Sequence, residues 1–248
     1  MQTFEAIRDA KCNEFVRLVR IQNEKDCLEY IAKYDGFYDA TVDMHDRMNM
    51  LQLACTYKLD QLAIALIDKK CNLTHQDNGG FTALAYASYH DLTHVVTYII
   101  DKLTDRTTRT TLYLQSEMMY LCDCSRDTKS VIKMIDCGYD IYYKNHRNES
   151  LFTVAINCRA GEIIIKLIDI DTDFIKEFNT LYTNPKCKKN KFHHNITKYC
   201  VGKYDAYKCE IIATMNDASP TNMLYQSFRT IYAVKLVDII CDFILLRM

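Results

Sequence analysis

The chain has 248 residues, of which 49% are apolar and 25% are charged, and its net charge at pH 7 is −1. This balance excludes a global electrostatic attraction to nucleic acid or to an anionic membrane. Charged residues are scattered over residues 3–25, so we expect no secretory signal and an intracellular protein, in the cytoplasm or the nucleus. A reducing compartment would keep the 12 cysteines as free thiols.

The N-terminal residues 1–43 predict a helical cap. Residues 3–20 carry apolar side chains at the spacing of a helix pair, with Ala6 twelve residues before Leu18. A further helix is predicted at 27–34, where it would link the cap to the next part of the chain.

Residues 44–174 hold a sequence repeat with a period near 33 residues. Four times an apolar residue is followed by isoleucine, and the steps between these pairs are 33, 35 and 33 residues. A small residue stands twelve positions before the first member of each pair. The pairs are Leu66–Ile67, Ile99–Ile100, Met134–Ile135 and Leu167–Ile168, and the small residues are Ala54, Ala87, Cys122 and Ala155.

Each repeat predicts two short helices. Apolar residues recur at i and i+3 in the first helix and at i, i+1, i+4 and i+5 in the second, which places them on one helical face. A period of this length indicates a stacked array, because one unit cannot bury its apolar face alone. The third repeat is two residues longer than the others, and we assign this insertion to the segment 104–116.

The pattern resembles the ankyrin repeat. Residues 77–87 read Asp-Asn-Gly-Gly-Phe-Thr-Ala-Leu-Ala-Tyr-Ala, which matches the family's D-x-x-G-x-T-P-L-H-x-A at the Asp, Gly, Thr, Leu and final Ala. The resemblance implies an all-α ankyrin-repeat solenoid of about 4–6 helix-pair units with helical caps, including four degenerate repeats in residues 44–174. The family uses glycine where the second helix ends, whereas this chain has Lys70, Leu103 and Asp171 there. We therefore predict distorted loops and a lower stability than in regular arrays.

The C-terminal residues 175–248 predict a degenerate repeat and capping helices. Residues 176–181 open this repeat, and helices are predicted at 208–215 and 223–248. The basic segment 184–194 predicts an exposed loop. Charged residues interrupt the apolar face of the last helix, so it is not predicted to span a membrane.

No group of residues predicts catalysis, a cofactor or a metal. The glycine-poor chain offers no phosphate-binding loop, and no nucleophile has an obvious base. Two alternatives remain open. Residues after 175 could form a metal-binding or catalytic module that the repeats target, although their ligand-type residues match no common zinc module. The basic segment 186–194 could instead bind nucleic acid. The ligand-type residues are Cys187, His193, His194, Cys200 and Cys209.

The resemblance implies a non-catalytic module that binds another protein. In the ankyrin family, partners contact mainly the hairpin tips and the residues just after the close-packed alanine. At matching positions here, the tip residues are His45, Asp46, Met48, Asn78, Phe81, His146, Arg147 and Glu149, and the helix residues are Thr56, Tyr57, Tyr89, His90, Asn157 and Cys158. The alternative is that Phe81 packs onto a neighbouring hairpin and that Tyr57 and Tyr89 cover helix ends.

The composition of the repeats carries a second resemblance. Degenerate repeats that are rich in Ile, Tyr, Asn and Cys are similar to those of ankyrin proteins from large DNA viruses, such as poxviruses and giant viruses, and from intracellular bacteria. This similarity implies a host protein as the partner and an immune-modulating role in host–virus interaction.

Overall fold

The computed structural model describes residues 2–181, 191–228, 237 and 239 of the chain. This part of the chain is predominantly helical, which confirms the predicted all-α class. It divides into two compact units, residues 1–160 and 161–248, which are described separately. The three segments expected from the sequence, with boundaries after residues 43 and 174, stay a prediction.

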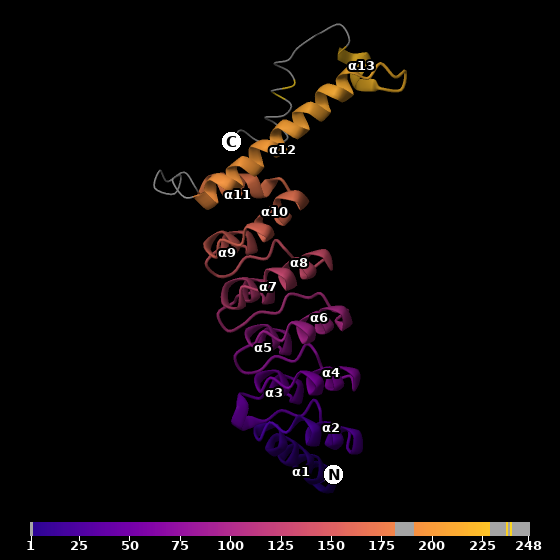
Figure 1. The fold of residues 1–248 in the computed structure, drawn as a ribbon, viewed down its shortest axis with the longest axis vertical. Helices are drawn as coiled ribbons and strands as arrows, with labels where there is room; N and C mark the ends of the chain where they lie inside the picture. The colour runs from indigo at the N-terminus through magenta and orange to yellow at the C-terminus, as the bar shows by residue number, and fades with distance from the viewer. Residues whose placement is uncertain (1, 182–190, 229–236, 238, 240–248) are drawn as a thin grey trace. The chain divides into compact units, whose positions relative to one another are not determined.

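In the first unit, consecutive helices form pairs, and each pair packs against the next (Figure 1). We call the first helix of each pair the inner helix and the second the outer helix. The inner helices pack on one another in sequence order, and so do the outer helices. The first three pairs are α1 (Gln2–Arg20) with α2 (Glu24–Lys33), α3 (Met50–Thr56) with α4 (Asp60–Asp68), and α5 (Ala83–Tyr89) with α6 (Thr93–Lys102). In the fourth pair, the inner helix is α7 (Glu117–Tyr120) continued by η2 (Leu121–Ser125), and the outer helix is α8 (Thr128–Asp136). The inner helix α9 (Leu151–Asn157) follows.

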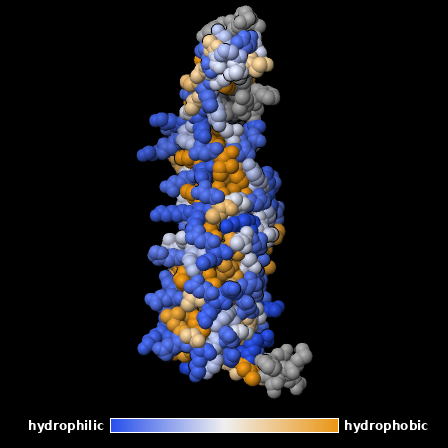
Figure 2. Space-filling view, turned by 90° about the vertical axis from the view of Figure 1, so that its right-hand side faces the viewer, coloured by the Kyte–Doolittle hydropathy of each residue, from blue (hydrophilic) through white to orange (hydrophobic). Residues whose placement is uncertain are grey.

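The repeat residues form the core. The four pairs that end in isoleucine lie on α4, α6, α8 and α10, and all eight side chains are buried. The four small residues of the inner helices are also buried, which allows the two helices of a pair to approach closely. On the side of the first unit that carries the outer helices, apolar side chains gather in separate patches among hydrophilic ones (Figure 2).

The inner helices α3, α7 and α9 begin at polar side-chain caps. The Asn49 side chain accepts a hydrogen bond from the Gln52 amide, and Ser150 and Thr153 form the same reciprocal capping box. Each turn between an inner helix and the helix that follows it contains one residue in the left-handed conformation, and these residues are Gln22, Lys58, Asp91, Arg126 and Arg159.

The segments between consecutive pairs fold back as hairpins. An isolated antiparallel bridge closes the first, third and fourth hairpins. A backbone hydrogen bond from the Asp77 amide to the Phe81 carbonyl closes the second. We call residues 43–47, 78–80, 111–115 and 145–149 the first to fourth tips. The Asn78 amide donates to the Asp46 carbonyl at 2.8 Å, and the Leu112 amide donates to the Gly79 carbonyl at 2.9 Å. Backbone hydrogen bonds therefore join the first three tips.

The insertion in the third repeat is divided between two places. In three repeats the small residue stands five positions after the helix cap, whereas Cys122 stands six positions after Ser116. The π-helical turn η2 accommodates the additional residue. Only one of the two inserted residues therefore lies in the segment 104–116, where we expected both.

One other expectation needs correction in the first unit. Residues 3–20, which have helix-pair spacing, form the single helix α1 and pair with α2 instead. Phe15 on α1 is fully buried, and its ring lies 5.2 Å from the ring of Phe37. At the expected glycine positions, Lys70 adopts the left-handed conformation (φ +62°), whereas Leu103 is extended.

The second unit contains α10 (Gly161–Ile170), α11 (Asp173–Leu181), α12 (Lys191–Asn216) and α13 (Met223–Phe228). α12 starts at Lys191, so Phe192, His193 and His194 are helical, not part of a loop as predicted. The predicted helix at 208–215 is only the end of α12, because residues 191–216 contain no proline to end it earlier. Most of the predicted helix at 223–248 lies outside the described residues.

None of the helices in the described ranges is both long and apolar enough to cross a membrane.

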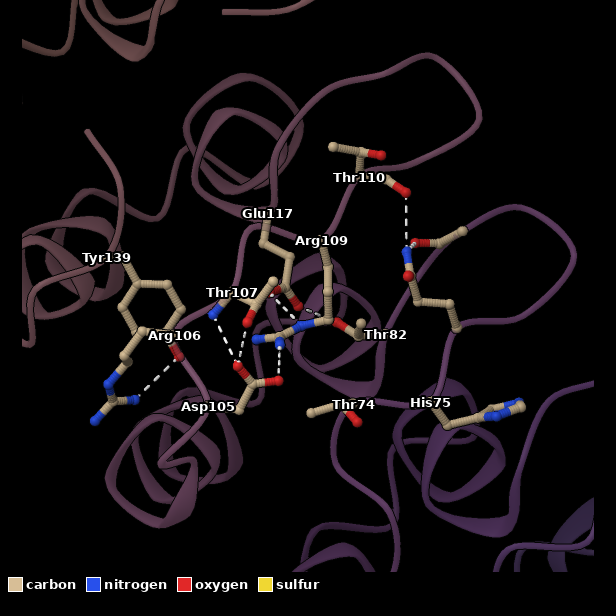
Figure 3. Close-up of polar contacts among 12 residues, drawn as sticks. Thr74, His75, Thr82, Asp105, Arg106, Thr107, Arg109, Thr110, Glu117 and Tyr139 are labelled. Carbon is tan, nitrogen blue, oxygen red and sulfur yellow. Dashed lines mark hydrogen bonds and ion pairs between the residues drawn. The ribbon is translucent and has the colours of Figure 1, made fainter. Parts of the chain in front are cut away.

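A buried ion pair lies at the base of the third hairpin (Figure 3). Arg109 Nε donates to Glu117 Oε2 at 3.0 Å, and both side chains are buried. The Thr82 hydroxyl donates to the other carboxylate oxygen, and Asp105 accepts from Arg109 Nη1 at 3.2 Å. Burial raises the pKa of Glu117, and the attraction of Arg109 opposes this shift. The pair ties the third hairpin to the start of α5 and to α7.

We predict that Glu117→Ala lowers the unfolding free energy by about 3 kcal/mol, because it leaves the buried Arg109 guanidinium without its main counterion. The double variant Arg109→Met/Glu117→Leu removes both charges and should recover most of this loss. Urea denaturation followed by far-UV circular dichroism measures both variants. A double variant no more stable than the single one would contradict this account of the pair.

We also predict that Gly80→Ala destabilises the contact between the second and third hairpins. A Cβ atom at Gly80 would lie 2.7 Å from the Thr110 carbonyl oxygen, and the residue has a φ of +75°. Gly36→Ala is the matched control, since Gly36 has a φ of +74° and open space around it. The left-handed strain of about 1 kcal/mol is common to both variants, and Gly80→Ala should lose about 1–3 kcal/mol more. Equal losses in urea denaturation would mean that the hairpins can separate freely.

Candidate functional site

The four tips and the C-terminal ends of the inner helices form the surface that the sequence analysis singles out. We call it the tip surface. Side-chain contacts link its parts: Gln115 of the third tip donates to Asp123 Oδ2 on η2 at 3.3 Å, and the Cys158 thiol after α9 donates to Asp123 Oδ1 at 3.5 Å. The third tip, η2 and the end of α9 are therefore neighbours on one surface.

The predicted residues of the first tip differ in exposure. His45 is half-buried, 2.9 Å from Arg20 Nη2, with its ring against Tyr57. Burial, together with Arg20, lowers the pKa of His45, so the imidazole is neutral at neutral pH. Asp46 is exposed, but Met48 is buried below Thr56 and supports the hairpin from inside.

The predicted aromatic residues also differ in exposure. Phe81 is half-buried, with its ring 5.1 Å from Tyr120 on α7 and 6.0 Å from Tyr86 on α5. It therefore packs against inner helices and not onto a neighbouring hairpin as the alternative had it. The side chain of Tyr89 is 59% exposed at the end of α5, with its ring against His90. Burial lowers the pKa of His90, and Lys58 adds to this shift.

Most predicted residues near the fourth tip are exposed. His146, Arg147 and Asn157 are open to solvent, together with Asn78 of the second tip. Glu149 is half-buried, and one of its carboxylate oxygens accepts a hydrogen bond from the Asn145 side-chain amide at 2.8 Å. The structure therefore brings most of the predicted residues to one surface, and it assigns supporting positions to Met48, Phe81 and Glu149.

The third tip was missed by the sequence analysis, although it is the most apolar. Leu112 is 72% exposed, Tyr113 73% and Leu114 45%. The repeat register could have located them, because they lie 34 residues after Asn78–Gly80 and 34 before His146–Asn148. The insertion obscured this register, so residues 104–116 received no site prediction.

The third tip is held firmly. Besides the bond from the Leu112 amide to Gly79, the Gln76 side-chain amide donates to the Thr110 carbonyl at 2.9 Å. The Tyr143 hydroxyl donates to the Leu114 carbonyl at 3.0 Å. The backbone on both sides of the exposed leucines is therefore anchored to the neighbouring hairpins.

Leu114 has an unusual backbone conformation. Its φ is +56°, in the left-handed region, where a bulky residue is disfavoured. The same positions of the second and fourth hairpins carry Gly80 and Asn148, which tolerate this region more easily. An exposed leucine at this position costs conformational energy and buries little apolar surface in return.

Two kinds of chemistry can be assessed in the described residues, namely metal binding and thiol reactivity. Within residues 2–181 and 191–228, no three His, Cys, Asp or Glu side chains are grouped so that they could hold a metal ion. Burial raises the pKa of Cys122 to about 12 and that of Cys200 to about 11, so both thiols are protonated and poor nucleophiles at neutral pH. Cys187 and most of the segment 186–194 lie outside the described residues.

No protein-family model matches the chain, and a search of the curated proteins finds no match either.

Proposed function

We propose that residues 44–174 form a degenerate ankyrin-type solenoid and that this protein is a non-catalytic module that binds another protein through its tip surface. Stacked helix pairs, buried repeat residues and hairpins joined by backbone hydrogen bonds support the solenoid. Six of the fourteen predicted contact residues are exposed and support the binding surface: Asp46, Asn78, Tyr89, His146, Arg147 and Asn157.

The third tip is the observation that carries the proposal. Three consecutive large side chains, Leu112, Tyr113 and Leu114, are exposed on this hairpin. The same positions of the second and fourth hairpins carry polar residues or glycine. Burial of such side chains in an interface contributes about 1.5–3 kcal/mol each, and tyrosine is enriched among interface hot spots. Hydrogen bonds fix the tip before any partner arrives, which lowers the entropy cost of association.

The class of partner follows from the compositional resemblance. Ankyrin proteins of large DNA viruses and intracellular bacteria act on proteins of their hosts. The proposal is therefore that this protein is a host-interaction factor and that its target is a host protein, for example a component of immune signalling.

We predict that Leu112→Ser/Tyr113→Ser abolishes partner capture without unfolding the protein. Both side chains are more than 70% exposed, so the fold loses little apolar burial. Immobilised wild-type and variant proteins would be incubated with extracts of candidate host cells, and the captured proteins would be quantified by mass spectrometry. Proteins that depend on the tip should fall more than about tenfold in the variant.

The control is Ile7→Ser/Met223→Ser, which removes two exposed apolar side chains from α1 and α13, outside the four tips and the C-terminal ends of the inner helices that define the tip surface. This variant should capture the same proteins as the wild type. If the tip variant retains every captured protein while its circular dichroism spectrum is normal, the tip surface is not the binding surface.

We further predict that Leu114→Asn separates stability from binding. Asparagine tolerates the left-handed conformation, so the unfolding free energy should be unchanged or up to about 1 kcal/mol higher in urea denaturation. Capture of the tip-dependent proteins should nevertheless weaken, because the leucine side chain is lost. A large loss of stability would show that Leu114 is retained for packing, and its exposure would then say little about a partner.

A further inference from the structure

The surroundings of the third tip carry unpaired positive charge. Arg126, Lys144, Arg147 and Arg159 are all exposed, and within the described part of the chain none of them forms an ion pair or a side-chain hydrogen bond. They come from the turn after η2, the strand and tip of the fourth hairpin, and the turn after α9.

The acidic side chains of the same region are already engaged. Asp123 accepts from Gln115 and Cys158, and Glu149 accepts from Asn145. Asp127 caps α8 by accepting from the Ser130 amide at 3.1 Å. These three acids keep their negative charges, because their donors are neutral, but hydrogen bonds hold their carboxylates in the fold. The four cations outnumber them, and within the described residues no such bond holds the cations.

Contacts place these cations beside the apolar tip. The Tyr143 hydroxyl bonds to the Leu114 carbonyl, so the next residue, Lys144, lies at the edge of the third tip. Asp123 joins Gln115 of that tip to Cys158, and the charge of Arg126 acts on the same Cys158 thiol. An apolar centre thus has a basic margin on the side of the fourth hairpin.

We infer that the third tip and its basic margin bind an acidic polypeptide segment that carries bulky apolar side chains. The inference rests on the proposed function and names the chemistry of its partner. Leu112 and Tyr113 supply the apolar contacts, which contribute most of the affinity in protein interfaces. The basic margin speeds encounter with acidic segments and disfavours basic ones, because unlike charges attract and like charges repel across an interface.

Single-stranded nucleic acid is the competing occupant for a surface with basic and aromatic residues. It is less suited to this surface, because two of the three exposed tip residues are leucines, which cannot stack on bases as aromatic rings do. The proposal therefore commits to a polypeptide, and nucleic acid is an outcome of the test.

The probe is a displayed library of random 16-residue peptides. It would be selected on the immobilised full chain, after removal of peptides that bind the Leu112→Ser/Tyr113→Ser variant. The peptides that remain should be enriched in Asp and Glu together with Leu, Ile, Phe or Tyr. Single selected peptides, labelled with fluorescein, then give dissociation constants by fluorescence anisotropy at low and high salt.

The charge contribution is tested with Arg126→Glu/Lys144→Glu/Arg147→Glu. We expect an affinity for the selected peptides at least about tenfold lower than that of the wild type, with most of the difference lost at high salt. The matched control is Lys69→Glu/Lys70→Glu/Lys198→Glu, which reverses three exposed charges directly after α4 and on α12 and should bind like the wild type.

The outcomes separate the inference from the proposed function. Tip-dependent peptides without acidic enrichment, or with affinity that the charge reversal leaves unchanged, would overturn the inference and leave protein binding intact. A selection that yields no tip-dependent peptide would overturn both. Binding of fluorescein-labelled oligo(dT) or oligo(U) that is tighter than any peptide and is lost on charge reversal would replace the polypeptide with nucleic acid.

Discussion

The backbone contact between neighbouring hairpins constrains everything else on the tip surface. Gly80 lies so close to the Thr110 carbonyl that no side chain fits between them, and the Leu112 amide bonds to Gly79 alongside. Because the hairpins meet through their backbones, side chains at the tip positions other than Gly80 can vary without changing the stacking. This freedom explains how one array can carry a polar second tip and an apolar third tip.

The buried ion pair secures the same hairpin from below. Arg109 and Glu117 stand at the two ends of the third hairpin, and Thr82 joins them from the start of α5. A buried ion pair adds little net stability compared with apolar residues of the same size, but its hydrogen bonds have strict geometry. The pair therefore fixes the position of the third hairpin, which belongs to the longest of the repeats.

The sequence predicted the helices of the repeats well, because a helical face repeats every three or four residues and burial enforces the pattern. The isoleucine pairs and the small residues mark the core directly. The apolar tip could not be predicted in the same way, since exposed residues obey no periodicity, and only the register from Gly80 to Asn148 pointed to it. The extent of α1 and α12 escaped prediction because neither segment has a residue that marks where a helix ends.

The π-helical turn η2 has a consequence for the length of a repeat. It absorbs one extra residue between Ser116 and Cys122 while Cys122 and the helix that follows keep their places in the core. A single-residue insertion in an inner helix can therefore be accommodated at such a turn without a shift of the core, and a repeat that is longer than its neighbours still stacks with them.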